Sequence, residues 1–293
     1  MAFNWQTFRV RTISSLIFVG VMLGGLLWNQ WSFLILFSII QFGCWWEYLR
    51  LLEKIHQTVF HPYIKLGFMV AGYGLMLWFC GPQYQVNGYG LRENISLPVS
   101  AAGFCLLLIG IFQKNIIKPK AIGIAALGFI YISLSWGLVM DLYQYVATIY
   151  VHGNAFVVSG LFFPMLIMIS IWMNDTMAYL VGSMIGKTPL TKISPKKTWE
   201  GTIGGVILGI AITCVLMYFF FIPDYLLFFI IIPVSAIAAI TGTFGDLLES
   251  KLKRMANVKD SGQLLPGHGG FLDRFDSQLI AVFLTWLFIR VLF

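Results

Sequence analysis

The sequence predicts an all-α integral membrane protein, a polytopic helical bundle of about nine transmembrane helices with a cytoplasmic N-terminus. Of its 293 residues, 59% are hydrophobic and 11% are charged, whereas soluble domains have roughly 45–50% apolar and 25% charged residues. Apolar runs close to the ~20 residues that cross a bilayer recur along the whole chain. Basic residues, finally, gather in alternate connecting loops, as the positive-inside rule requires.

Each predicted span is an apolar run bounded by charged or turn-forming residues. The spans lie near residues 13–30, 32–52, 63–82, 96–113, 121–142, 156–185, 202–222, 225–249 and 271–292. Turn-forming pairs such as Gly81-Pro82 and Asn87-Gly88 separate early spans on the outer side. Such lengths leave no room for a sizeable soluble domain.

The seventh span has two local signals. Ser194-Pro195 precedes it, and a hydroxyl followed by proline is a typical helix start. Gly201, Gly205 and Gly209 then recur every four residues, so one helix face has no side chains. This spacing predicts a second helix packed closely against that face.

The distribution of basic residues sets the orientation. With the N-terminus in the cytoplasm, 17 of the 19 lysines and arginines lie inside, and only Arg92 and Arg290 lie outside. This asymmetry supports an odd number of spans. Because the cations of this +7 chain are spread over several cytoplasmic loops, we expect anionic membrane lipids as partners and no nucleic acid.

Acidic residues divide the chain functionally. Eight of the twelve carboxylates follow residue 170. Residues 1–150 are therefore predicted to form N-terminal scaffold helices, and residues 151–293 a catalytic region with a polar pocket facing the cytoplasm. Both belong to a single membrane domain.

The end of the eighth span gathers polar groups. If its helix continues, Asp246, Glu249, Ser250 and Lys253 follow one another at i, i+3, i+4 and i+7 and share one face. Two acids, a hydroxyl and a cation then converge. The alternative interpretation is a solvated helix end with an intrahelical ion pair.

A glycine-rich loop, residues 266–270, leads into Asp273 and Asp276, which lie one turn apart at the start of the last span. Carboxylates there also suit the helix dipole without any ligand. Two of them flanking Arg274, opposite Asp246 across a hairpin, form a better oxygen-ligand set for Mg²⁺. A hard cation beside lysines and arginines indicates phosphate chemistry.

Two further polar elements stand out. Asn174-Asp175, with Tyr179, lies inside an apolar run, and an intramembrane acid is a functional candidate. The octapeptide SPKKTWEG, residues 194–201, is predicted on the same cytoplasmic side.

These segments carry a resemblance to a known family. S-x-L-K-R, K-D-x-G, L-P-x-H-G-G and D-R-F-D, at their spacings within residues 250–276, resemble the signature of the phosphatidate cytidylyltransferases, the CDP-diacylglycerol synthases. SPKKTWEG and the N-D-x-x-A-Y of residues 174–179 look like that family too. The resemblance covers about the C-terminal 120 residues, whereas the first five spans are similar only in hydropathy and number.

The resemblance implies that CTP and phosphatidic acid give CDP-diacylglycerol and pyrophosphate, with Mg²⁺ required. It leaves open whether a second metal ion, such as K⁺, also binds. Asp246 and Asp273 match the family's metal-binding acids, and Asp276 is a further ligand or a partner of Arg274. Lys253 and Arg274 join Asp246 and Asp273 as catalytic candidates. The candidates for binding CTP or the lipid phosphate are Asp175, Ser194, Lys196, Lys197, Ser250, Lys251, Arg254, Lys259 and His268.

The resemblance also favours a homodimer, and the short N-terminus favours a bacterial inner membrane. Two other functions remain open at this point. A CTP-dependent polyprenol or phytol kinase would transfer the γ-phosphate instead. An ion-coupled transporter would use the polar cluster as a gate, although the charges gather at one end and paired broken helices are not evident. CDP-alcohol phosphotransferases fit less well, because their D-G-x-x-A-R helix is not found in the sequence.

Overall fold

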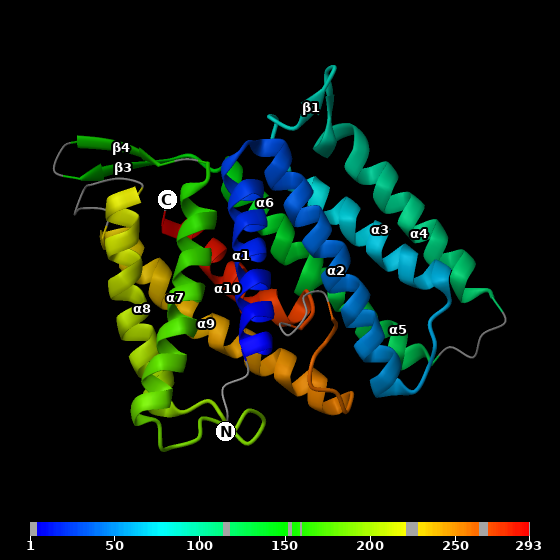
Figure 1. Ribbon diagram of the computed structural model, residues 1–293. Coiled ribbons are helices and arrows are strands. Elements are labelled where there is room, and N and C mark those ends of the chain that lie inside the picture. The colour runs from blue at the N-terminus through cyan, green and yellow to red at the C-terminus, as the bar shows by residue number, and fades with distance from the viewer. Residues whose placement is uncertain are drawn as a thin grey trace. The chain divides into compact units, whose positions relative to one another are not determined.

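The computed structural model describes residues 5–113, 118–151, 154–158, 160–220, 228–263 and 269–292. Each of the nine predicted spans coincides with a helical segment there (Figure 1). Seven of these segments are long and apolar enough to cross a membrane; α3, with 17 residues, and the apolar part of α1, Leu16–Leu27, are shorter. The prediction of an all-α polytopic membrane protein is confirmed.

The chain separates into two compact units. The first, here the N-terminal unit, contains residues 1–140 and 252–275. The second, here the C-terminal unit, contains residues 141–251 and 276–293. Residues 252–275, which carry most of the family signature, therefore group with the N-terminal helices rather than with residues 151–251.

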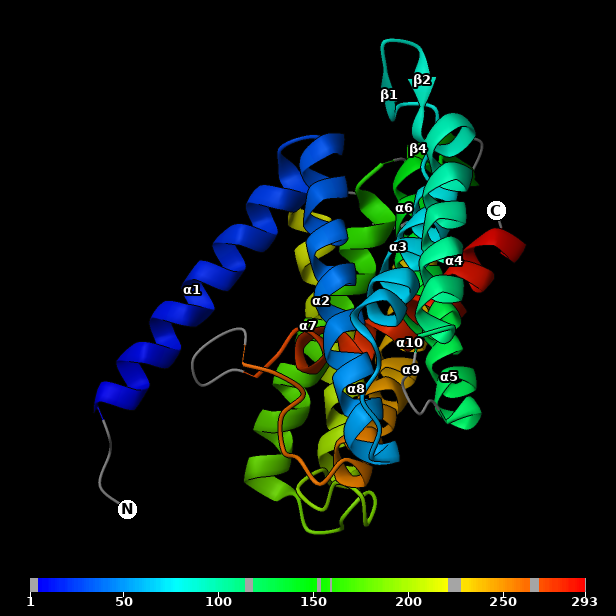
Figure 2. The same cartoon turned by 90° about the vertical axis from the view of Figure 1, so that its right-hand side faces the viewer.

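Most of the N-terminal unit consists of helices joined by short turns. Its elements are α1 (Trp5–Leu27), α2 (Gln30–His56), α3 (Pro62–Trp78), β1 (Gln85–Val86), β2 (Tyr89–Gly90), η1 (Leu91–Ile95), α4 (Ser96–Ile111), α5 (Pro119–Ala126), η2 (Phe129–Leu134) and α6 (Ser135–Gln144), whose last turn belongs to the other unit. Figure 2 shows α1 and α2 meeting at one end and diverging from there. Asn29 caps α2 by accepting from the backbone N–H groups of Trp31 and Ser32.

The predicted turn at Asn87-Gly88 joins β1 to β2. Both residues have positive φ, 51° and 84°, as a two-residue hairpin turn requires. Packing inside the unit centres on the fully buried Trp45, whose ring lies near Phe68 and Phe129 and whose indole N–H donates to Ser133 Oγ at 2.8 Å. The helix α2 is thus held on its apolar side by aromatic packing and one interhelical hydrogen bond.

In the C-terminal unit, a hairpin precedes the helices α7 (Phe162–Ile185), α8 (Trp199–Phe220), α9 (Phe228–Met255) and α10 (Leu272–Leu292). The first turn of α10 and the last of α9 belong to the N-terminal unit. β3 (Ala147–Val151) pairs antiparallel with β4 (Asn154–Val158). The prediction of a span beginning at residue 156 is therefore wrong, because an alternating β-branched and aromatic stretch pairs as a strand before Phe162 begins the helix.

Close packing of α7 against α8 confirms the role predicted for the glycine face. A Cβ on Gly205 would meet Ala178 at 2.6 Å, and one on Gly209 would meet the backbone of Asn174 at 3.0 Å. The predicted helix start at Ser194-Pro195 is wrong. These residues form a turn, and α8 begins at Trp199 with Thr198 Oγ1 accepting from the Gly201 N–H at 3.1 Å.

Candidate active site

Three carboxylates meet in the C-terminal unit. Asp246 and Glu249 lie three residues apart on α9, and Asp276 lies on α10. One carboxylate oxygen from each falls within 4.8 Å of the others. Glu249 is fully buried and Asp276 is 8% exposed. These three residues are called the acid cluster below.

Backbone packing brings the two helices of the acid cluster together. Gly245 on α9 faces α10, and a Cβ there would collide with the Asp276 carbonyl and come within 3.0 Å of Ser277. The absence of a side chain at Gly245 thus allows the two helices to approach. The Ser277 N–H in turn donates to Asp276 Oδ1 at 2.7 Å, which orients that carboxylate.

The acid cluster suits a hard divalent cation. Carboxylates so close together repel one another unless a proton or a cation lies among them. Two oxygens on opposite sides of a bound Mg²⁺ lie roughly 4 Å apart, so the spacing of this cluster is of the right order. Asp246, Glu249 and Asp276 would be the protein ligands.

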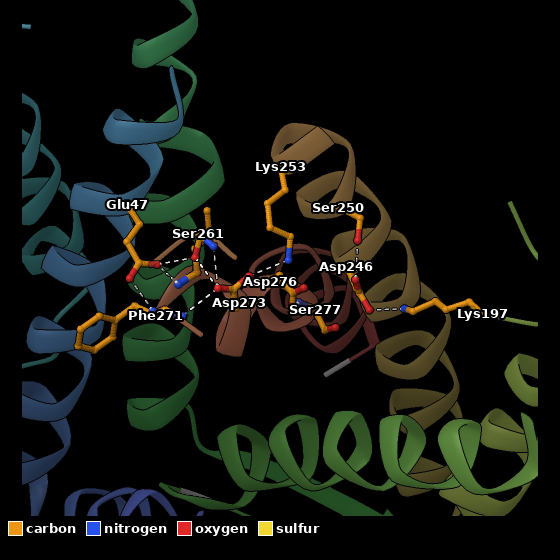
Figure 3. A network of polar contacts seen from close by, with 12 residues as sticks. Glu47, Lys197, Asp246, Ser250, Lys253, Ser261, Phe271, Asp273, Asp276 and Ser277 are labelled. Atoms are coloured by element: carbon orange, nitrogen blue, oxygen red, sulfur yellow. Dashed lines mark hydrogen bonds and ion pairs between the residues drawn. The ribbon is translucent and has the colours of Figure 1, made fainter. Parts of the chain in front are cut away.

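Cationic and hydroxyl groups from the same unit surround Asp246. Lys197 Nζ forms an ion pair with Asp246 Oδ2, and Ser250 Oγ donates to Asp246 Oδ1 at 3.2 Å (Figure 3). Lys197 reaches α9 from the loop before α8, where its own N–H donates to the Ser194 carbonyl at 3.1 Å. The turn that replaces the predicted helix start therefore places this lysine.

Asn174 and Asp175 belong to the same electrostatic environment. Asn174 is 3% exposed, and its Nδ2 donates to Asp175 Oδ1 at 3.4 Å. Lys197 and Asp246 both act electrostatically on Asp175. The predicted elements on α7, in the loop before α8 and on α9 are thus brought together.

Asp273 lies in a second network, inside the N-terminal unit. Its Oδ1 pairs with Lys253 Nζ at 2.6 Å. Its Oδ2 accepts from the backbone N–H of Ser261 at 2.8 Å, from Ser261 Oγ at 2.9 Å and from the Gly270 N–H at 2.8 Å. Ser261 and Gly270 belong to the connection between α9 and α10, residues 256–271, here called the signature loop, of which residues 264–268 lie outside the described residues. Asp273 therefore joins two described parts of this loop, and its assignment as a metal ligand stays a prediction.

Glu47 on α2 completes that network and was missed in the sequence. Its carboxylate accepts from Phe271 N at 3.0 Å, from Leu272 N at 2.9 Å and from Ser261 Oγ at 2.6 Å. Glu47 is 5% exposed. An acid in an apolar span is itself a functional signal, although the distribution of carboxylates predicts residues 1–150 to be a scaffold.

The other predicted residues differ in exposure. Lys196, Lys251, Arg254 and Lys259 are exposed, whereas Ser194 and Arg274 are partly buried. His268 lies outside the described residues. The sequence identified the face of α9 that carries Glu249 but did not assign this residue as a metal ligand.

Comparison with known proteins gives one consistent result. The model of the cytidylyltransferase family matches residues 9–292. A phosphatidate cytidylyltransferase of Staphylococcus saprophyticus is 29% identical over 283 residues, which cover 94% of this chain and 96% of that protein. The chloroplastic phosphatidate cytidylyltransferase 4 of Arabidopsis thaliana is 50% identical over 117 residues. That match covers 40% of this chain but only 29% of the plant protein's length.

Proposed function

Because the chain belongs to the cytidylyltransferase family, we propose that it transfers the cytidylyl group of CTP to phosphatidic acid, giving CDP-diacylglycerol and pyrophosphate. The observation that carries this proposal is the acid cluster, in which Glu249 and Asp276 are buried and Asp246 pairs with Lys197. The names of the bacterial and plant relatives support the choice of substrates.

The reaction joins two polyanions. An oxygen of the lipid phosphate attacks the α-phosphorus of CTP, and the bond from that phosphorus to the bridging oxygen of the β-phosphate breaks, which releases pyrophosphate. Bound Mg²⁺ would supply charge neutralisation for the phosphate oxygens. Fixed cations that hold the same oxygens lower the repulsion between the substrates.

Two lysines, one in each unit, are each paired with a carboxylate of the same unit. Lys197 is oriented by Asp246, and Lys253 is oriented by Asp273. An ammonium group can donate hydrogen bonds to phosphate oxygens. Candidates for binding the CTP phosphates or the lipid phosphate also include Lys251, Arg254, Lys259 and Arg274. A second metal ion such as K⁺ beside Mg²⁺ stays a possibility left open by the resemblance.

The protein is an integral membrane protein, with seven candidate membrane spans in its described residues. We place it in a bacterial inner membrane with the acid cluster toward the cytoplasm, because the basic residues gather on that side in the predicted topology. CTP would arrive from the cytosol and phosphatidic acid from the bilayer. The homodimer and the lack of a nucleic-acid partner stay expectations from the sequence.

Product analysis tests the proposed function. The purified protein is incubated in detergent with phosphatidic acid, Mg²⁺ and CTP labelled at either the α- or the γ-phosphate. Cytidylyl transfer puts the α-label in the lipid fraction and the γ-label in pyrophosphate. A γ-labelled lipid would instead identify a lipid kinase. No labelled lipid from either nucleotide, with folded protein, would refute both enzymes and favour transport.

A further inference from the structure

Glu47 lies more than 200 residues before Ser261, Phe271 and Leu272, yet its carboxylate accepts a hydrogen bond from each of them. Both of its oxygens accept hydrogen bonds: Oε1 from the N–H of Phe271, and Oε2 from the hydroxyl of Ser261 (Figure 3). Oε2 also accepts from the N–H of Leu272. A buried carboxylate is costly unless such hydrogen bonds replace its hydration. These hydrogen bonds therefore stabilise the carboxylate of Glu47 in its buried position.

The two backbone donors are at the start of α10, where the first N–H groups of a helix have no partner within the helix. A carboxylate at this position satisfies them and interacts favourably with the positive end of the helix dipole. Glu47 thus performs the function of an N-cap, but from another helix, α2. It ties the first turn of α10 to the N-terminal helices.

Ser261 connects Glu47 to the lysine. Its hydroxyl lies 2.6 Å from Glu47 Oε2 and 2.9 Å from Asp273 Oδ2, and its N–H donates to the same Asp273 oxygen. The other oxygen of Asp273 pairs with Lys253. Because the hydroxyl has a single proton, it serves one carboxylate at a time. Glu47, Ser261, Asp273 and Lys253 therefore form one continuous chain of polar contacts.

Glycines shape the space around the Glu47 carboxylate. A Cβ on either Gly262 or Gly270 would overlap its oxygen atoms, and a Cβ on Gly43, one turn earlier on α2, would overlap the Phe271 ring. Three positions thus lack side chains where α2 meets the loop. The contact depends on the backbone coming close to this carboxylate and not only on its charge.

We propose that Glu47 is a positioning residue for the reaction: it fixes Ser261 and the start of α10, and through Ser261 and Asp273 it orients the ammonium of Lys253. This inference rests on the proposed function for its consequence, since Lys253 is one of the cations assigned to phosphate. It gives the N-terminal helices, predicted as a scaffold, a direct part in orienting Lys253.

The decisive variant is Glu47→Gln. The glutamine side chain has the same size as glutamate but only one acceptor oxygen. Its NH₂ group cannot accept a hydrogen bond, so at least one of the three donors loses its acceptor. We expect kcat to fall roughly 10- to 100-fold, by analogy with the loss of a residue that orients a metal-binding side chain. KM for CTP should change much less. Hydrogen exchange at the amides of Phe271 and Leu272 should quicken, while later amides of α10 stay protected.

Glu53→Gln is the matched control. Glu53 is also on α2, accepts from a backbone N–H, that of Phe60 at 2.8 Å, and pairs with Lys65 at 2.9 Å, outside the Glu47 network. Its loss removes a comparable interaction from the same helix. We expect near-normal kcat for Glu53→Gln, with at most a small loss of stability.

A double variant separates positioning from general stability. If Glu47 acts through Ser261, the kcat losses of Glu47→Gln and Ser261→Ala should not multiply in the double variant. The proposal is overturned if Glu47→Gln retains wild-type kcat per folded molecule, or if the two losses multiply. A wild-type protein that makes no α-labelled lipid would instead refute the proposed function, and the exchange measurement would still report the contact itself.

Discussion

The ammonium of Lys197, in the loop before α8, forms an ion pair with the carboxylate of Asp246 on α9. Asp246 also belongs to the acid cluster. One carboxylate thus contacts a fixed cation and contributes to a group of oxygens suited to a bound cation. With a metal ion bound at the acid cluster, this arrangement would present positive charge to a phosphate from two sources.

Removing that fixed cation should impair the reaction. For Lys197→Ala we expect a loss of roughly 100-fold in kcat/KM for CTP, the size of effect seen when one preorganised electrostatic donor is removed. Steady-state assays at saturating phosphatidic acid measure it. Lys192→Ala, an exposed lysine of the same loop, is the control and should retain normal kinetics. Equal kinetics for the two variants would rule out a role for Lys197 in the site.

Glu249 should set the affinity for the metal. Glu249→Gln removes the charge of one proposed ligand with little change in size, so the Mg²⁺ concentration that gives half-maximal activity should rise about 10- to 100-fold. Activity is titrated with Mg²⁺ from a chelator-treated preparation. Glu93→Gln, at an exposed acid of η1, should titrate like the wild type. An unchanged titration of Glu249→Gln would remove this residue from the ligand set.

Adding a methyl group to a glycine should lower stability on the packed face of α8 and raise it at an open position on α5. A methyl group at Gly205 has no room against Ala178, so Gly205→Ala should destabilise the protein by about 1–3 kcal/mol. Nothing lies within 4 Å of a Cβ at Gly123 on α5, so Gly123→Ala should stabilise its helix by about 0.5–1 kcal/mol. Thermal unfolding in detergent measures both. Equal shifts would contradict the close packing of α7 and α8.

Arg290 should matter for stability but not for chemistry. Its guanidinium donates to Asp141 Oδ2 at 2.6 and 3.1 Å and lies 4.2 Å from the centre of the Tyr145 ring. This contact joins α6 and α10, and Arg290 follows Asp276 by about 20 Å along the helix. Arg290→Ala should cost about 1 kcal/mol of unfolding free energy, given its partial exposure, with unchanged kcat. A large loss of kcat would show that this end is coupled to the site.

Local patterns explain what the sequence could predict. Apolar runs located all nine helical segments, and the four-residue spacing of Gly201, Gly205 and Gly209 identified a close helix contact. The 3.6-residue period placed Asp246 and Glu249 on one face of α9, which is helical as far as Met255. These features depend on residues only a few positions apart, so they can be recognised in the sequence alone.

Contacts between residues far apart in the sequence could not be predicted in this way. Nothing near Glu47 in the sequence indicates that a loop more than 200 residues later donates three hydrogen bonds to it. The grouping of residues 252–275 with the N-terminal helices also depends on long-range contacts and could not be predicted from neighbouring residues. α9 and α10 each continue from one unit into the other, so no break in the sequence marks the change. Asp273 and Asp276, one turn apart on α10, looked alike in the sequence but have different partners.

The measurement that tests the account most directly is the transfer of α-label from CTP to lipid by the wild type and by Asp246→Asn, each with Mg²⁺ and with chelator. We expect labelled lipid only from the wild type with Mg²⁺, and a folded, membrane-inserted Asp246→Asn protein at least 100-fold less active. Wild-type labelling by Asp246→Asn, or undiminished labelling in chelator, would contradict a metal-dependent cytidylyl transfer at the acid cluster.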